Sequence, residues 1–140
     1  LLNNFSSILR NKLNGCEISD AIAELKTQTL NNWLVISGSD EAELRNLFKE
    51  RDLTTFFEGG IFGSPDDKIT IIERELNNGN ISSPAIFFGD AKYDFDCADL
   101  FGIDFVFCCK WTDFADWKKF QKQKKFKSIE GLEDLLMLCD

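Results

Sequence analysis

Two aspartates in the middle of the chain, Asp90 and Asp94, are the residues best suited to metal chemistry. They follow residues 85–88 (AIFF), an unbroken apolar run that is typical of a fully buried β-strand. A helical pattern begins near Lys92, so Asp94 would return toward Asp90 above the end of that strand. Two carboxylates beside a helix N-terminus suit a hydrated Mg²⁺ ion and leave room for a phosphate. The alternative is that both aspartates only cap the helix, and this stretch alone leaves the two interpretations open.

A lysine earlier in the chain, Lys68, is the second candidate. It follows residues 64–67 (SPDD), which carry helix start signals with Ser64 as the expected cap. A cation in a first turn faces the positive end of the helix dipole, at a cost of about 0.3–1 kcal/mol. Because such local conflicts are commonest at functional sites, Lys68 is a candidate anion ligand. Taken alone, a solvated lysine paired with Asp66 or Asp67 is the favoured alternative.

The elements that must position these residues alternate between strands and helices from residue 33 onward. The expected strands cover residues 33–37, about 60–63, 85–88 and 103–109. Strand and helix alternation predicts an α/β fold with a parallel sheet and right-handed crossovers. Ser37 and Gly38 would lie at the carboxyl end of the first strand and provide a hydroxyl and a flexible glycine. Since parallel strands end at one edge, Ser37, Lys68 and Asp90 should meet on one face.

The composition restricts the class of function. With 140 residues and 44% apolar content, the chain can form one globular core and is too short for two ordinary domains. It has no histidine, which excludes a Ser-His-Asp triad, a histidine base and a histidine metal site. The five cysteines form no C-x-x-C pair and are expected to be reduced core residues. No apolar stretch approaches the roughly 18 residues of a membrane helix and no signal-peptide pattern is present, so a soluble cytoplasmic protein is expected.

The last part of the chain is basic and aromatic. The net charge is −8, but residues 110–127 contain seven lysines and two aspartates, which is a local charge of +5. Aromatic residues recur there every three positions, at Trp111, Phe114, Trp117 and Phe120. An amphipathic helix with a solvated basic face is favoured over a platform for single-stranded nucleic acid. Residues 129–138 are expected to form the last helix.

Taken together, the candidate residues resemble the motifs of the haloacid dehalogenase-like hydrolase superfamily, in its phosphoglycolate phosphatase-like branch. Residues 33–37 (WLVIS) resemble its second motif, and Lys68 is similar to its third-motif lysine. Residues 89–94 (GDAKYD) fit its fourth motif, Gly-Asp-x-x-x-Asp. The resemblance covers roughly residues 18–112. It implies a three-layer, Rossmann-like parallel sheet.

The resemblance also implies a chemistry, which is Mg²⁺-dependent hydrolysis of small phosphorylated metabolites through an aspartyl-phosphate. Ser37 and Gly38 would bind the transferring phosphoryl group, and Lys68 would neutralise its oxygens. Asp90 and Asp94 would hold Mg²⁺. This agrees with the general physics of phosphoryl transfer, which depends on positioning and charge stabilisation.

The family's first motif, an Asp-x-Asp that supplies the nucleophile, is not found in this chain. The acidic residues before Ser37 are Glu17, Asp20 and Glu24, all in or beside an amphipathic helical pattern. A truncated sequence is the leading explanation, and a degenerate, catalytically inactive relative that binds phosphate or acts as an interaction module is the alternative.

The absent motif has a structural consequence. Residues 1–14 would be a remnant of a helical cap, and residues 15–140 the α/β core without its first, central strand. That strand would lie between the strands of residues 33–37 and 85–88. We expect the chain to pair those two strands directly, or to recruit a segment from a neighbouring molecule by homo-oligomerisation or a strand swap, because unpaired backbone inside a sheet is costly.

Overall fold

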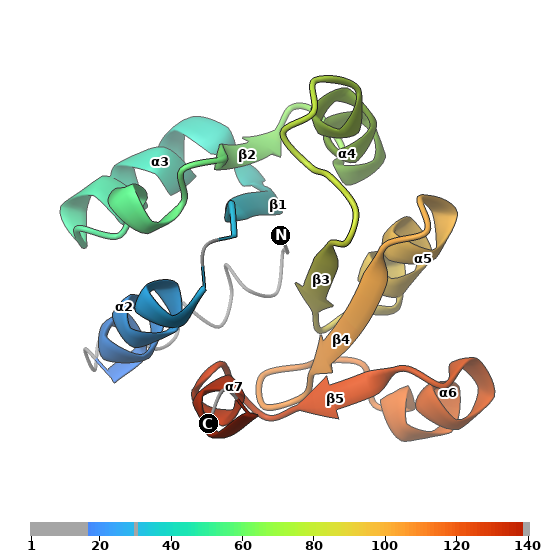
Figure 1. Cartoon of the computed structure of the whole chain (residues 1–140). Helices are drawn as coiled ribbons and strands as arrows, with labels where there is room; N and C mark the ends of the chain where they lie inside the picture. The colour runs from blue at the N-terminus through green and yellow to red at the C-terminus, as the bar shows by residue number, and fades with distance from the viewer. Residues whose placement is uncertain (1–16, 30, 139–140) are drawn as a thin grey trace.

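The structure is a computed structural model that describes residues 17–29 and 31–138. Figure 1 shows its elements, which are α2 (Glu17–Gln28), β1 (Leu34–Asp40), α3 (Glu41–Glu50), the 3₁₀ helix η1 (Thr54–Phe56), β2 (Gly60–Ser64), α4 (Lys68–Asn77), β3 (Ile86–Gly89), α5 (Lys92–Leu100), β4 (Asp104–Cys108), α6 (Trp117–Lys124), β5 (Lys127–Ile129) and α7 (Glu133–Leu138). The predicted α/β class is confirmed, and the predicted cap remnant lies outside the described residues. Within the described ranges, no helix combines the length and the apolar character needed to cross a bilayer.

The strands form two parallel sheets. In the first, β1 pairs with β2, and Leu34 lies opposite Gly60. In the second, the order is β3-β4-β5, and Ile86 lies opposite Asp104. Among the described residues β1 and β3 are not paired, so direct pairing, the first of the two expected outcomes, is not what the structure shows. Figure 1 places β1 and β2 on one side and β3, β4 and β5 on the other.

The C-terminal part differs from the prediction. A short strand, β5, was not foreseen, since Lys127 and Ser128 are exposed and carry no strand signal. The basic helix α6 covers only Trp117–Lys124, so Trp111 and Phe114 lie in the preceding loop. The last helix begins at Glu133 and not at residue 129, because residues 127–129 are committed to the sheet.

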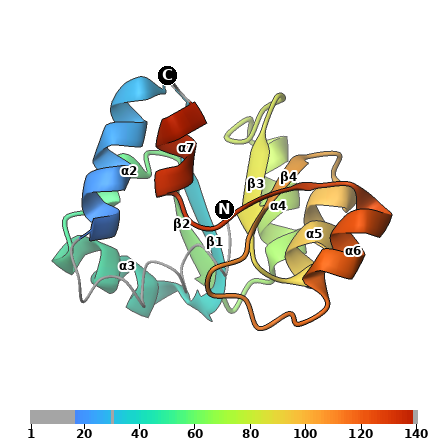
Figure 2. The ribbon, with the colours of Figure 1, turned by 90° about the horizontal axis from the view of Figure 1, so that it is seen from below.

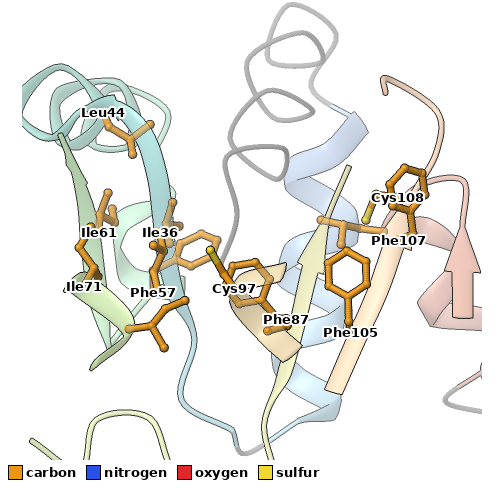
Figure 3. Packing of buried hydrophobic residues seen from close by; sticks show 14 of the residues in the cluster. Ile36, Leu44, Phe57, Ile61, Ile71, Phe87, Cys97, Phe105, Phe107 and Cys108 are labelled. Carbon is orange, nitrogen blue, oxygen red and sulfur yellow. The ribbon is translucent and has the colours of Figure 1, made fainter. Parts of the chain in front are cut away.

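The buried core draws side chains from both sheets. Successive residues 34–37 of β1 are all buried, although alternate side chains of a strand point to opposite faces. Both faces of β1 are therefore covered. Figure 3 shows Ile36 and Phe57 on the β1 side of the core, and Phe87 and Phe105 on the side of β3 and β4. Three of the cysteines, Cys97, Cys108 and Cys109, are free thiols, as predicted.

Candidate functional site

Helix α4 places Lys68 at its first position. Its cap is Asp67, whose Oδ1 accepts a hydrogen bond from the Thr70 amide at 2.7 Å. The prediction that Ser64 caps the helix is wrong, because Ser64 still belongs to β2 and lies opposite Asp40 in the sheet. The prediction that Lys68 lies in the first turn is confirmed.

The Lys68 side chain is buried, with only 2% of its surface exposed. Its Nζ donates to Oδ1 of Asp94, which is itself fully buried. The alternative of a solvated lysine paired with its neighbours is wrong: Asp66 pairs with Arg74 at 3.0 Å, and Asp67 is the helix cap. Burial lowers the pKa of Lys68, and the Asp94 carboxylate opposes this shift. The lysine therefore belongs to a buried ion pair.

Asp94 has two functions in the structure. Its Oδ1 accepts from Lys68, and its Oδ2 accepts from the Ala91 amide at 3.2 Å, which caps the first turn of α5. The approach to β3 is close: a Cβ added to Gly89 would lie 2.5 Å from the Cβ of Asp94. Glycine at this position therefore allows the carboxylate to reach the lysine. The interpretation that Asp94 caps the helix is therefore correct, but the same carboxylate also pairs with Lys68.

Asp90 follows β3 and is 94% buried, since 6% of its surface is exposed. It is not the cap of α5, because that position is Ala91. Burial raises the pKa of Asp90 from 3.8 to about 7; the charges of Asp94 and Asp113 add to this, and Lys68 opposes it. Near neutral pH this carboxyl group is therefore poised between its protonated and charged forms.

Ser37 and Gly38 lie inside β1, which continues to Asp40 and not only to residue 37 as predicted, although the regular pairing with β2 is interrupted after Ile36. Ser37 is buried, and its Oγ accepts a hydrogen bond from the Ser39 amide at 3.0 Å. Gly38 is exposed beside it. An ion pair joins Lys68 to Asp94, and the charges of both residues act on Asp90. The hydrogen bonds described for Ser37 do not join it to any of these three side chains.

Two residues near Asp90 were missed from the sequence. Thr112 donates from its Oγ1 to the backbone oxygen of Asp90, and its Oγ1 accepts from the Phe114 amide at 3.0 Å. Asp113, next in the chain, contributes to the raised pKa of Asp90. Both lie in the loop after β4. Applying the strand-end argument to β4, as it was applied to the strand before Asp90, would have pointed to this loop.

The donor set of this site suits a divalent cation with few protein ligands. The structure describes no group of three or more Asp, Glu, His or Cys side chains that could hold a metal among residues 17–29 and 31–138. Asp90 and Asp94 are hard oxygen donors, and Mg²⁺ in phosphoryl-transfer sites uses one or two carboxylates and keeps several waters. The site contains one lysine and two buried carboxylates. A bound cation would therefore also lower the free energy needed to ionise Asp90.

Comparison with known proteins shows which fold the chain has. Neither a protein-family model nor a curated protein sequence matches the chain. Among solved structures, a hydrolase of the haloacid dehalogenase-like family from Streptococcus pneumoniae matches with a TM-score of 0.69 and 23% sequence identity. The match covers 89% of this chain and 59% of that protein. The chain thus has a haloacid dehalogenase-like fold and spans less than two thirds of the protein that it resembles.

Proposed function

We propose that the protein, in its complete form, is a Mg²⁺-dependent phosphatase of small phosphorylated metabolites. The observation that carries this proposal is the buried Lys68–Asp94 ion pair beside Asp90, at the carboxyl ends of parallel strands. Open α/β sheets bind their ligands at this edge. The haloacid dehalogenase-like fold supports a hydrolase, and the substrate class and cytoplasmic location are parts of the same proposal.

Each residue has a defined part in the proposed chemistry. Lys68 provides a fixed positive charge in a site with little water, where charge stabilisation of a transferring phosphoryl group is most effective. Ser37 and Gly38 bind phosphoryl oxygens from the part of β1 where its regular pairing with β2 is interrupted. Asp90 and Asp94 hold Mg²⁺, which when bound neutralises charge that develops on the phosphoryl oxygens. The Thr112 hydroxyl fixes the backbone at Asp90.

The acceptor of the phosphoryl group is not among the residues identified. We propose that the complete protein provides it as an aspartate at the end of a strand between β1 and β3. Glu17, Asp20 and Glu24, the acidic residues before Ser37, belong to helix α2 and not to a strand. This favours one alternative, that the 140 residues alone are a catalytically inactive module that binds phosphate or a partner.

The test is hydrolysis of an aryl phosphate monoester by the 140-residue chain, with and without Mg²⁺. The variants are Lys68→Ala and Asp90→Asn, and the control is Asp99→Asn, at an exposed aspartate of α5. Mg²⁺-dependent turnover that falls at least about a hundredfold in both variants would support an enzyme complete in this chain. Binding of inorganic phosphate without turnover would support the inactive module. Folded protein with neither activity would contradict the phosphate-binding module and the phosphate-binding roles given to Ser37, Gly38 and Lys68.

A further inference from the structure

The surface of α6 and β5 carries a concentrated positive charge. Residues 117–129 contain six lysines and no acidic residue, so this segment has a charge of +6 in a chain whose net charge is −8. Figures 1 and 2 both place α6 at the periphery of the molecule, far from α2 and α3. We call the six exposed lysines the lysine patch; they are Lys118, Lys119, Lys122, Lys124, Lys125 and Lys127.

The lysine patch has no acidic partner within the described part of the chain. Ion pairs join basic and acidic side chains at several places in residues 17–29 and 31–138, but none of these pairs includes a lysine of the patch. The nearest acidic residues in the sequence, Asp116 and Glu130, lie just outside the two ends of the segment. The six charges therefore face an anion that the described residues do not provide.

The lysines of α6 form a basic outer face. Phe120 is buried, with 9% of its surface exposed. Because successive residues of a helix are about 100° apart, Lys118, Lys119 and Lys122 lie on the opposite side of α6 from Phe120. Lys122 is three or four residues from the other two lysines, and like charges at these spacings repel each other. This arrangement of charge lowers the stability of the helix.

The first turn of α6 shows a second conflict. Lys118 and Lys119 lie there, at the positive end of the helix dipole, where cations are unfavourable. That turn contains no acidic residue, and the side chain of the cap residue Asp116 accepts no capping hydrogen bond from the helix. At Lys68 the same conflict is explained by the buried pair with Asp94. In α6 the described residues provide no such explanation.

A third conflict is found where α6 ends. Lys125 is the C-cap and has a left-handed backbone, with φ of 61° and ψ of 44°. Glycine is the usual residue in this conformation at a helix end, because a Cβ makes the conformation unfavourable. Local rules are broken most often at functional sites. These three conflicts, all at lysines, therefore indicate that the positive charge itself has a function.

We propose that the lysine patch binds the sugar–phosphate backbone of a nucleic acid without reading its base sequence. Lysines that neutralise phosphates release bound counterions, and this release provides most of the affinity of sequence-independent binding. Residues 117–129 contain no arginine, the side chain that most often reads guanine through two hydrogen bonds. The sequence alone favours a solvated basic face, and the three conflicts are the reason to assign it a ligand. This inference does not depend on the proposed phosphatase activity.

Two other kinds of anionic partner match the patch less well. Protein interfaces are centred on anchors such as exposed Trp, Tyr or Arg, but Trp117 stacks on Phe107, with ring centroids 5.0 Å apart. None of the large apolar side chains that are exposed in the described chain belongs to residues 117–129. A helix that lies on a bilayer buries its apolar face in lipid, whereas Phe120 and Phe126 are already buried in the core. A phosphate backbone needs neither an anchor nor a free apolar face.

The experiment measures the fluorescence anisotropy of labelled single strands of RNA and of DNA, each in two unrelated sequences, with the full 140-residue chain. The strands end in hydroxyl groups, so they carry no phosphate monoester for the candidate site. We expect the two sequences of each polymer to bind with affinities within roughly threefold. The polymer that binds more tightly identifies the class of nucleic acid. Between about 50 and 200 mM salt the affinity should fall at least about fiftyfold, as expected when four or more lysines contact phosphates.

Two double variants test the location. Lys118→Gln combined with Lys122→Gln should weaken binding by roughly tenfold or more and lower the slope of log affinity against log salt by about two. The matched control is Lys49→Gln combined with Arg51→Gln, which changes the net charge equally at two exposed residues at the end of α3. Because charges farther away than a Debye length are screened, the control should bind within about twofold of the unmodified chain.

Lys125→Gly separates binding from stability. It removes one charge of the patch and relieves the left-handed strain. Nucleic-acid binding should therefore fall severalfold, while the unfolding free energy measured by chemical denaturation is unchanged or higher. A lysine that served only the structure would not show this combination.

Several results would overturn the proposal. Binding that does not weaken with salt, or that falls equally in the two double variants, would reject the patch as the site. Larger differences between the two sequences of one polymer would show base recognition. Equal competition by poly-glutamate or by phosphatidylserine vesicles would show a surface for any polyanion and not a nucleic-acid site. Absence of binding by folded protein would also reject the proposal.

Discussion

The two sheets of this molecule differ in how their cores are built. Around β1 and β2 the buried side chains are mainly aliphatic, as at Ile36, Leu44 and Ile71. Around β3, β4 and β5 the core is a cluster of phenylalanine rings, in which Phe95 and Phe120 have ring centroids 5.2 Å apart. Aromatic pairs at such distances add about 0.5–1.5 kcal/mol beyond the burial of their surface. Each half thus contributes side chains of a different kind to the shared core.

The two halves also differ in the chemistry that they contribute. The half with β1 and β2 provides the hydroxyl of Ser37 and, at the start of α4, the ammonium of Lys68. The half with β3 to β5 provides the carboxylates of Asp90 and Asp94. The Lys68–Asp94 pair is therefore where the two halves meet chemically. Neither half holds the site alone, and the predictions that follow test this division.

The largest effect is expected from Lys68→Met. This change leaves Asp94 buried without its cation, and breaking a buried pair costs about 3–5 kcal/mol of unfolding free energy. The measurement is chemical denaturation at neutral pH. The matched control is Lys92→Met, which breaks the exposed Lys92–Asp96 pair within α5, at 3.1 Å, and should cost no more than about 1 kcal/mol. Equal losses in the two variants would contradict the special role of the pair between the halves.

A double variant sharpens the same test. Lys68→Met combined with Asp94→Leu removes both charges, and apolar replacement of a buried ion pair is often close to neutral. The double variant should therefore be more stable than Lys68→Met alone. A further loss of stability would mean that Asp94 matters mainly for its hydrogen bond to the Ala91 amide.

The next effect is expected in the pH dependence of stability. The pKa of Asp90 is raised in the folded state to about 7 from 3.8, so folding binds a proton between these values. Its contribution to stability is complete below about pH 4 and is lost as the pH rises toward 7, by at most about 1.4 kcal/mol per pH unit. In EDTA, the difference in unfolding free energy between Asp90→Asn and the unmodified chain should therefore shift in favour of the variant as the pH rises.

Two controls accompany this titration. The matched control is Asp99→Asn, at an exposed aspartate of α5. Addition of Mg²⁺ at pH 7 should stabilise the unmodified chain and not Asp90→Asn, because binding to the folded state alone raises stability. A pH profile that is identical in Asp90→Asn and the unmodified chain would show that Asp90 does not titrate in this range.

The smallest effect is expected at Thr112, in the half with β3 to β5. Thr112→Val removes the hydrogen bond to the backbone oxygen of Asp90 and should cost about 0.5–1.5 kcal/mol of unfolding free energy. Thr112→Ser keeps the hydroxyl and should recover most of the loss. If Ser and Val variants were equally destabilised, the methyl group and not the hydrogen bond would be the important feature.

The sequence indicates candidate residues more readily than the local structure around them. Asp90 and Ser37 became candidates because continuous apolar runs mark buried strands, and residues at the carboxyl ends of such strands lie at the ligand-binding edge. Lys68 became a candidate because a cation in the first turn of a helix interacts unfavourably with the helix dipole. Its buried ion pair with Asp94 explains why a cation is present there. The pairing of Lys68 with Asp94 itself could not be predicted, since it depends on how two distant helices approach each other.

Local features that depend on tertiary context were missed. Ser64 has the side chain of a helix cap, but the sheet extends through it and moves the cap to Asp67. Strand β5 is only three residues long, and Lys127 and Ser128 have low strand preference. The position of β5 is determined by its pairing with the edge of β4, and the local sequence carries no information about that pairing.

The contact between α2 and α7, seen side by side in Figure 2, joins the first and last described helices. Residues of α2 such as Ile22 and Leu25 are buried in the finished molecule. During synthesis, however, α7 leaves the ribosome long after α2, because the whole of both sheets lies between them in the chain. Until α7 has been synthesised, part of the apolar face of α2 is not yet covered. Contacts between such distant segments of the chain also form slowly. The nascent chain is therefore expected to expose part of the apolar face of α2 until α7 has emerged.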